Sequence, residues 1–383
     1  MSSRRATLLV LNHNGAALLE KCLPSVVAAS RFGGQEHCVV VVDNASTDRS
    51  VELLRRDFPQ VEVRRKTRNR YLLSFNDAIS ECETDWVVIL NNDVIVEPDF
   101  LPPLLEHFSD RRVFAVTPHI RSDKPTERFG CRRYPILSRG VLHTRPDFSS
   151  PGVQLTLLAH GGAAALDREK FLALGGFDSL YWKCLYEDLD LSYAAWLLGW
   201  RVIFEPRSVV FHIGGASLGR GGGPSRKWRR VEERVRTLFV LKNIENHTML
   251  SQCLTFFALR VLKAAVSGDV SRMLAHLDIA LRWPRVVTAR RRTRAMRLYD
   301  DRAVFDALRR NRGPESHDGS GRGKEQRYIE YLYEELMKVA VSRRSARIGG
   351  LHDAGGSSTE DVTCEVSQQQ VRFWNQVRRT DRP

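Results

Sequence analysis

The N-terminal part of the chain alternates short strand-like runs with amphipathic segments. The strand-like runs are largely continuous in apolar residues, as in strands covered on both faces, and they lie at 6–11, 38–42, 61–65 and 86–90. Between them, apolar residues recur at helical spacing over 16–30 and 74–82, and a further helix is expected after Ser46 and Thr47. This alternation predicts an α/β domain in which helices flank a mostly parallel sheet.

Polar side chains stand where three of these predicted strands end. They are Asn12 and Asn14 after the first strand, Asp43 and Asn44 after the second, and Asn91, Asn92 and Asp93 after the fourth. Ligands of such sheets bind beyond the carboxyl ends of the strands. We therefore expect a binding site at this edge.

The rest of the chain is less regular and then becomes helical. Loops and a small hairpin are expected over 115–160, a strand edge and short helix over 161–182, and strands at 201–206 and 208–217. Helices are expected at 228–246, 249–266, 270–282 and 294–310. The chain thus divides into a sheet domain (1–218), a basic helical region (219–310), and a linker with one further helix at 326–343 and a largely disordered tail (311–383).

The net charge of +14 is concentrated in the helical region, where residues 220–312 hold 22 Lys and Arg against 8 Asp and Glu. Such a block meets an anionic partner, which can be nucleic acid, a phospholipid surface or a phosphorylated substrate. Its uncharged run, 248–259, is shorter than the roughly 20 residues that span a bilayer. Two interpretations stay open: an amphipathic hairpin on an anionic leaflet, or a helix docked on the sheet domain.

Cysteine usage and the N-terminus indicate a reducing compartment. The seven cysteines form no CxxC pair, which argues against a disulfide framework and against a structural zinc site. The first apolar run stops at Asn12, too early for the core of a signal peptide, and we interpret it as a buried strand. A cytoplasmic location is therefore expected.

Three acids, Glu187, Asp188 and Asp190, precede an apolar segment with helical spacing up to Trp200. Acids in a first turn favour the positive end of the helix dipole and can cap free N–H groups, so a purely structural role is one interpretation. The other is that one of them takes a proton from a substrate. The stretch by itself leaves both open.

Asp93 and His212 are candidate metal ligands. Asp93 follows an apolar strand and two asparagines, and hard divalent cations often take only one or two carboxylates when substrate phosphates complete the shell. His212 would add an imidazole, which favours tolerance of Mn²⁺ beside Mg²⁺.

Seven segments of the chain resemble family 2 glycosyltransferases of the GT-A type, close to the bacterial rhamnosyltransferase-like branch. They are "VLNHNGAALLEKCLPSV", "VVVDNASTDRSVELL", "RNRYLLSFNDAI", "WVVILNNDVIVEPDFL", "GGAAALDREKFLALGGFD", "YEDLDLSYAAWLLGWRVIFEP" and "VVFHIGGAS". Each is weak alone, but they occur in the family's order from about residue 6 to 218. The helical region is similar only in character, and the chain beyond 311 has no match.

The resemblance implies a set of donor-binding residues: Asn12, Asn14, Asp43, Asn69, Asn76, Asn91, Asn92, Gly161 and Gly162. Asn14 and Asp43 fall where the family holds the base and ribose, and the two glycines fall where it lines the sugar pocket. Asp93 stands at the DxD position, and His212 matches the histidine of the metal shell.

The resemblance also assigns the acids before Trp200. Asp188 matches the catalytic base, and Glu187 would orient it or contact the acceptor. One departure concerns "NRYL" (69–72), where the family commonly has Asn-x-Gly-Phe. Tyr71 therefore occupies the glycine place, which leaves the local backbone and the choice of donor open.

The resemblance implies transfer of rhamnose or a similar hexose from a nucleotide-diphosphate donor to a hydroxyl of a glycan or lipid-linked acceptor. Inversion needs one carboxylate base, and Mn²⁺ or Mg²⁺ would neutralise the leaving diphosphate. A glycosidase would instead need two carboxylates across the bond. The basic helical region would keep such an enzyme on an anionic membrane surface, on its cytoplasmic face.

Two other functions remain as alternatives. A nucleotidyltransferase shares the α/β domain and the acid-bound metal, but "NHNGAALLEK" is a poor version of its Gly-rich triphosphate loop. A nucleic-acid-binding protein could use the basic block over 220–312, although the aromatic residues there mostly fit buried helix faces.

Overall fold

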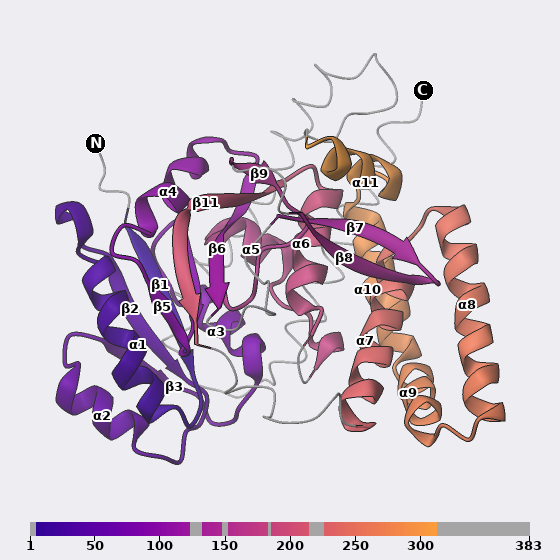
Figure 1. Ribbon diagram of the computed structural model, residues 1–383, viewed down its shortest axis with the longest axis horizontal. Helices are drawn as coiled ribbons and strands as arrows, with labels where there is room; N and C mark the ends of the chain where they lie inside the picture. The colour runs from indigo at the N-terminus through magenta and orange to yellow at the C-terminus, as the bar shows by residue number, and fades with distance from the viewer. Residues whose placement is uncertain (1–4, 123–131, 148–151, 183–184, 214–225, 312–383) are drawn as a thin grey trace, which may run out of the picture.

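The computed structural model describes residues 5–122, 132–147, 152–182, 185–213 and 226–311. A nine-stranded sheet lies at its centre, with the strand order β3-β2-β1-β4-β10-β6-β11-β5, and β9 pairs with β11. Helices cover both faces of the sheet, and further helices follow it in the chain (Figure 1). The predicted α/β sheet domain with a C-terminal helical extension is confirmed.

The first four strands in this order are parallel. They are β3 (Glu62–Arg65), β2 (Cys38–Asp43), β1 (Ala6–Asn12) and β4 (Trp86–Asn91). The apolar side chains of β1, β2 and β4 are almost all buried because helices pack on both faces. The bounds of these strands agree with the predicted ranges to one residue.

The second half of the sheet is mixed. β10 (Ala163–Asp167) is antiparallel to β4 and to β6 (Val113–Ser122). β11 (Arg201–His212) is parallel to β6 and antiparallel to β5 (Val94–Val96) and β9 (Gln154–Leu155). It is continuous where two strands were expected, with a register shift between Glu205 and Val209.

Two helical layers enclose the sheet. One face carries α1 (Ala16–Ala29), α2 (Ser50–Asp57) and α4 (Leu101–Glu106), and the other carries α3 (Ser74–Ser80), α5 (Arg168–Leu174) and α6 (Glu187–Leu197). The expected caps of α2 are wrong, because the helix begins after Arg49 with no side-chain cap.

The expected hairpin and the first three expected C-terminal helices are present, and α10 was not expected. The hairpin joins β7 (Arg132–Ser138) to β8 (Val141–Asp147) and contacts α7 and α11. The helices are α7 (Arg226–Asn243), α8 (His247–Val266), α9 (Val270–Leu281), α10 (Trp283–Met296) and α11 (Asp301–Arg310). The single helix expected over 294–310 is wrong, because Arg297 is extended and Asp300 caps a new helix.

A buried polar network fastens α7 to α6. Lys242 Nζ donates to Oδ2 of Asp178 and to Oδ2 of Asp190, each at 2.6 Å, and Asn243 donates to Asp190 Oδ1 at 2.7 Å. Burial alone would lower the pKa of Lys242, but the two carboxylates raise it. Apolar side chains of α7, α10 and α11 also share one core with the sheet. The division of the chain at residue 218 stays a prediction.

Helix α8 is long and apolar enough to cross a membrane by length and composition only, and little of it is buried. It forms the flank of the molecule farthest from β3, with α9 beside it (Figure 1). The helix predicted at 326–343 and the tail after it lie outside the described residues.

Candidate active site

The ends of β1 and β2 bring their polar residues together as predicted. Asn12 stands opposite Asp43 in the parallel register, and both are buried. Asn12 Nδ2 donates to Asp43 Oδ1 and to Ser46 Oγ, each at 3.2 Å, and the Ser46 N–H donates to Asp43 Oδ2 at 3.1 Å. Ser46, which was expected to cap a helix, is therefore part of this polar edge.

Asn14 shapes the loop that follows β2. Its Oδ1 accepts from the backbone N–H groups of Thr47 (2.7 Å) and Asp48 (3.3 Å), and its own N–H donates to Ser46 Oγ at 2.9 Å. Asn14 reaches this position with a φ of 49°, in the left-handed region that Asn tolerates better than most residues. Its contact with a base or ribose stays a prediction.

Tyr71 keeps the backbone that a glycine would supply. Its φ is 52°, which is unusual for a bulky residue. Asn69 Oδ1 accepts from the Tyr71 N–H at 2.9 Å, and Asn44 Nδ2 donates to the Tyr71 carbonyl at 3.2 Å. The ring is 41% exposed and lies edge-on to Trp182. At the place of the family's glycine, Tyr71 therefore has a φ that glycine adopts readily, and it adds an aromatic ring.

The end of β4 is tied to β1 and β10. Asn92 Nδ2 donates to Asn12 Oδ1 at 2.7 Å, and a Cβ on Gly15 would overlap the Asn92 amide. The Asn91 N–H donates to the Gly162 carbonyl at 2.9 Å, and the Asn91 amide would lie 3.0 Å from a Cβ on Gly162. Both glycines therefore allow a close approach of backbone to these asparagines.

Pairing of β5 with β11 brings His212 to Asp93. His212 stands opposite Val94, and its Nε2 lies 3.2 Å from Asp93 Oδ2. Asp93 is 2% exposed, and its Oδ1 has no hydrogen-bond partner within the described part of the chain. A buried carboxylate oxygen without a partner is costly, and carboxylate and imidazole are both ligands of Mn²⁺. These two residues therefore fit a divalent cation.

Asp188 is held by a glycine backbone at the start of α6. Its Oδ2 accepts from the Gly161 N–H at 3.1 Å, and its Oδ1 accepts from the Leu189 N–H at 2.8 Å. A Cβ on Gly161 would lie 2.6 Å from Leu72 Cδ1 and 3.5 Å from Asp188. Only glycine thus allows this approach without moving a neighbour, and the carboxylate has a fixed orientation.

Glu187 lies beside Asp188 but in a different environment. It is 5% exposed, and its Oε2 has no hydrogen-bond partner among the residues that the structure describes. Burial, and then the negative charge of Asp188, raise the pKa of Glu187 to about 8. Leu185 and Tyr186 precede it with φ values of 78° and 73°, so a left-handed turn directs the chain into α6.

Two of the polar residues make structural contacts. Asp190 binds Lys242 and Asn243 and accepts from the Tyr181 hydroxyl at 2.8 Å, which agrees with its structural interpretation. The Asn76 amide donates to the carbonyl of Phe177 and accepts from its N–H, each at 2.9 Å. Asn76 therefore fastens α3 to the turn after α5, and its donor contact stays a prediction.

His160 belongs to the site and was missed by sequence reasoning. Its Nδ1 accepts from the Gly162 N–H at 3.1 Å. Burial lowers the pKa of His160, and the charges of Asp188, His212 and Asp93 all act on it. It therefore lies near both the acid of α6 and the metal-ligand pair. Its position directly before Gly161 and Gly162 was the one signal that could have found it.

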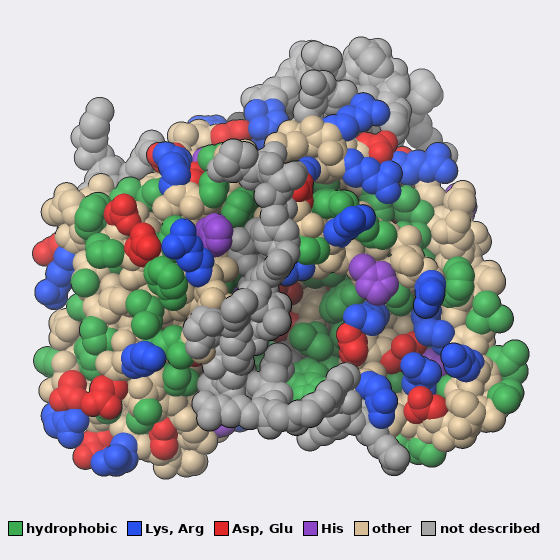
Figure 2. All heavy atoms as spheres, viewed as in Figure 1, with side chains coloured by type: hydrophobic (Ala, Val, Ile, Leu, Met, Phe, Trp, Pro, Cys, Tyr) green, Lys and Arg blue, Asp and Glu red, His purple; other side chains and the backbone are tan. Residues whose placement is uncertain are grey.

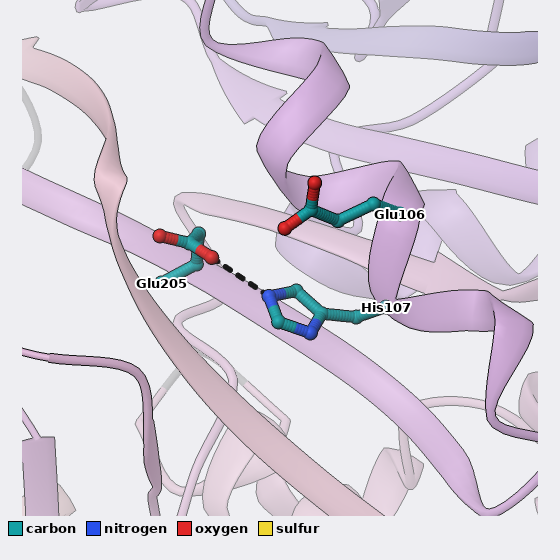
Figure 3. Close-up of side chains that lie close together, drawn as sticks. All are labelled: Glu106, His107 and Glu205. Atoms are coloured by element: carbon teal, nitrogen blue, oxygen red, sulfur yellow. Dashed lines mark hydrogen bonds and ion pairs between the residues drawn. The ribbon is translucent and has the colours of Figure 1, made fainter.

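A second group of metal-ligating side chains, Glu106, His107 and Glu205, lies outside this site (Figure 3). Their ligand atoms lie within 4.8 Å of one another, and His107 Nε2 is 2.7 Å from Glu205 Oε2. Arg207 donates to Glu205 Oε2 at 2.7 Å and also to Glu106. The guanidinium already balances the buried carboxylate, so we interpret this group as an ion-pair network.

The fold and the site define an α/β enzyme domain of the GT-A type, with a polar strand edge, a carboxylate–histidine pair and a separate carboxylate. Residues 7–174 match the family model described as "Glycosyl transferase family 2". The match to this part of the chain agrees with the predicted family 2 glycosyltransferase domain. Asp93 lies within the matched range, and Asp188 and His212 lie beyond it. The rhamnosyltransferase-like branch stays a prediction.

Curated relatives of the chain are also glycosyltransferases by name. The chain is 23% identical over 245 residues to "Putative polypeptide N-acetylgalactosaminyltransferase 10" of Drosophila melanogaster. This alignment covers 57% of this chain and 38% of the relative. The chain is also 30% identical over 144 residues to "Pre-mycofactocin glycosyltransferase" of Mycobacterium tuberculosis, which covers 36% and 28%. The chain thus spans 38% or less of the length of these relatives.

Solved structures similar to the chain include two glycosyltransferases. TarS 1–349 of S. aureus in complex with UDP-GlcNAc has a TM-score of 0.49 at 15% identity, covering 80% of this chain and 92% of that one. The mannosyltransferase PcManGT of Pyrobaculum calidifontis in complex with GDP-Man and Mn²⁺ has a TM-score of 0.47 at 20% identity, covering 80% and 84%.

Proposed function

We propose that the protein transfers a sugar from a nucleoside-diphosphate donor to an acceptor hydroxyl, with inversion at the anomeric carbon. The observation that carries this proposal is that Asp188, held by Gly161, and the Asp93–His212 pair both lie near His160. A base and a metal-binding pair in one site are the two elements that inverting transfer requires.

The donor nucleoside would bind at the polar edge. Asn12, Asp43 and Ser46 form a buried hydrogen-bonded group there, and Asn14 and Asn69 fix the loops beside it. Because these side chains hold one another, the edge offers rigid donors and acceptors for a base and ribose. Gly161 and Gly162 lie against Asp188 and Asn91, and they would line the pocket of the donor sugar.

The diphosphate would bind next to Asp93 and His212, which would hold Mn²⁺ or Mg²⁺. When bound, the ion neutralises the charge that develops on the leaving diphosphate. The chain itself contributes the ligand geometry, because the β5–β11 pairing fixes the distance between the carboxylate and the imidazole. Asn91 stands where the resemblance places the first acid of a DxD motif, and it would supply a neutral oxygen ligand.

Asp188 would act as the general base. As the acceptor oxygen attacks the anomeric carbon, its proton passes to the Asp188 carboxylate, and the bond to the diphosphate breaks on the opposite side. The Gly161 N–H holds the carboxylate in place during this transfer. Glu187, with its pKa raised to about 8, is protonated at neutral pH and does not compete as a base. We propose rhamnose or a similar hexose as the sugar and a glycan or lipid-linked acceptor.

The first test replaces the proposed base. Asp188→Asn should lower transfer by about 10²–10⁴-fold while donor binding, measured by protection from thermal unfolding, is kept. Asp57→Asn, an exposed acid at the end of α2, is the matched control and should be fully active. Wild-type turnover in Asp188→Asn would remove the base from the mechanism.

The second test uses a panel of nucleotide sugars, including a rhamnose donor, and measures nucleoside diphosphate release and the anomeric configuration of the product. Release with an inverted product is expected. A retained configuration would contradict inversion. Absence of turnover with every donor, together with salt-sensitive binding of nucleic acid, would contradict the proposed function as a whole.

A further inference from the structure

Helix α8 is apolar on its outer side as well as on its inner side. Its inner side buries Cys253 and Ala264. Its outer side exposes large apolar residues, and these are Leu254 (46%), Leu259 (54%), Leu262 (61%) and Val266 (82%). A helix that is apolar all round is expected in a protein core or in contact with lipid, and the outer side of α8 is not in the core.

Helix α9 continues this surface. Val270, Leu274, Leu277 and Leu281 recur at helical spacing and are 63%, 38%, 53% and 73% exposed, whereas Ala275 and Ile279 are buried. The two helices meet at a turn between Val266 and Val270, so their exposed residues are continuous there. We call the eight exposed side chains named on α8 and α9 the hairpin surface.

The surroundings of the hairpin surface are basic. Residues 247–296, which span helices α8 to α10 and their connections, contain nine Lys and Arg against two Asp and Glu. Lys263 and Arg285 are exposed at its borders, and Trp283, 52% exposed, follows the last residue of α9 by two positions. In Figure 2, Lys and Arg side chains gather beside the hydrophobic side chains of the right-hand edge, where α8 lies. Apolar residues bordered by cations and Trp are typical of helices that bind anionic lipid surfaces.

The inner side of α8 is held by the protein, which excludes a spanning orientation. Arg260 donates to Glu233 of α7 at 2.7 Å and to the carbonyl of Arg139 in the β7–β8 turn at 2.9 Å. A Cβ on Gly140 would lie 2.6 Å from the Phe256 Cβ, so the turn packs closely on the helix. A helix crossing a bilayer would have to leave these partners. The helix can therefore contact lipid only with its outer side.

We propose that the hairpin surface docks on an anionic lipid bilayer, with α8 and α9 lying flat in the interface and the border cations on lipid phosphates. A second copy of the chain would bring two surfaces with the same positive excess together, which like-charge repulsion opposes. The inference goes beyond glycosyl transfer, because it concerns a surface apart from the residues of the candidate site.

The test measures co-sedimentation of the full chain with phosphatidylcholine vesicles with and without phosphatidylglycerol. The wild-type protein should bind the vesicles with phosphatidylglycerol, and added salt should weaken binding. The double variant Leu262→Ser with Val266→Ser should bind at least about tenfold more weakly, with an unchanged unfolding temperature because both side chains are exposed.

The matched control is the double variant Phe32→Ser with Val153→Ser, which removes two apolar side chains exposed to 42% and 44% outside the hairpin surface. It should bind vesicles as the wild type does. Equal binding by the wild type and the Leu262/Val266 variant would overturn the proposal. The proposal would also be overturned if the wild type did not bind vesicles but formed a dimer in light scattering, and if only the Leu262/Val266 variant lost that dimer. This result would assign the surface to contact with a second copy of the chain.

Discussion

Replacing Glu187 by Gln should change how the stability of the protein depends on pH. Glu187 is 5% exposed, and burial followed by the charge of Asp188 raises its pKa from 4.5 to about 8. Gln keeps the shape of the side chain and removes the titrating proton. The substitution thus separates the packing of this position from its ionisation.

The expected magnitude follows from the two pKa values. Between pH 4.5 and 8 the folded protein holds a proton on Glu187 that the unfolded chain releases. The free energy of unfolding therefore falls as the pH rises through this window, by about 1.4 kcal/mol for each pH unit and on the order of 5 kcal/mol in total. Below the window both states are protonated, and above it both are ionised, so the contribution is then constant.

Urea unfolding of the wild type and of Glu187→Gln at a series of pH values measures this effect. The difference between the two curves isolates Glu187, because the other groups titrate in both proteins. The wild type should lose stability relative to the variant as the pH rises. In an Asp188→Asn background the pH range over which stability falls should become narrower, because the negative charge of Asp188 no longer raises the pKa of Glu187. Parallel curves for the wild type and Glu187→Gln would refute the reasoning.

Three further predictions concern the supports of the site. Lys242→Met leaves the carboxylate of Asp190 buried without its cation, so the free energy of unfolding measured in urea should fall by about 3–5 kcal/mol. A loss below about 1 kcal/mol, which is typical of a salt bridge at the surface, would contradict this. Gly15→Ala should displace the Asn92 amide, cost about 1–3 kcal/mol and weaken donor binding measured by calorimetry; unchanged donor affinity would be inconsistent with the binding edge. Mn²⁺ should raise the unfolding temperature of the wild type but not that of Asp93→Asn, and EDTA should stop transfer. An equal rise of the unfolding temperature in both proteins would show that the ion binds elsewhere.

The polar strand edge was predictable because its rules are local. Parallel strands covered on both faces are continuous apolar runs, and the residue after each run must lie at the same edge of the sheet. Asn12, Asp43 and Asn91 follow from that rule alone. The parallel pairing of β1 with β2 and β4 confirms it.

Other features depend on contacts between distant parts of the chain. His212 reaches Asp93 because β11 pairs with β5, and no local pattern shows which strands pair. Tyr71 adopts a glycine-like φ against its own preference, held by hydrogen bonds to Asn44 and Asn69. The single expected helix over 294–310 failed because Asp300 caps a new one, a signal that the apolar spacing alone does not contain.

The acids at the start of α6 show why residue type and spacing could not assign their roles. Asp188 and Asp190 share one helical turn and the same favourable dipole, yet their partners differ. Asp190 accepts hydrogen bonds from Tyr181 and Asn243, and the ammonium of Lys242 in α7 neutralises its charge. Asp188 meets only backbone N–H groups in the hydrogen bonds found within the described residues, and these orient a carboxylate without neutralising it. A carboxylate that is held but not paired can accept a proton, so the choice of base follows from the partners that the fold supplies.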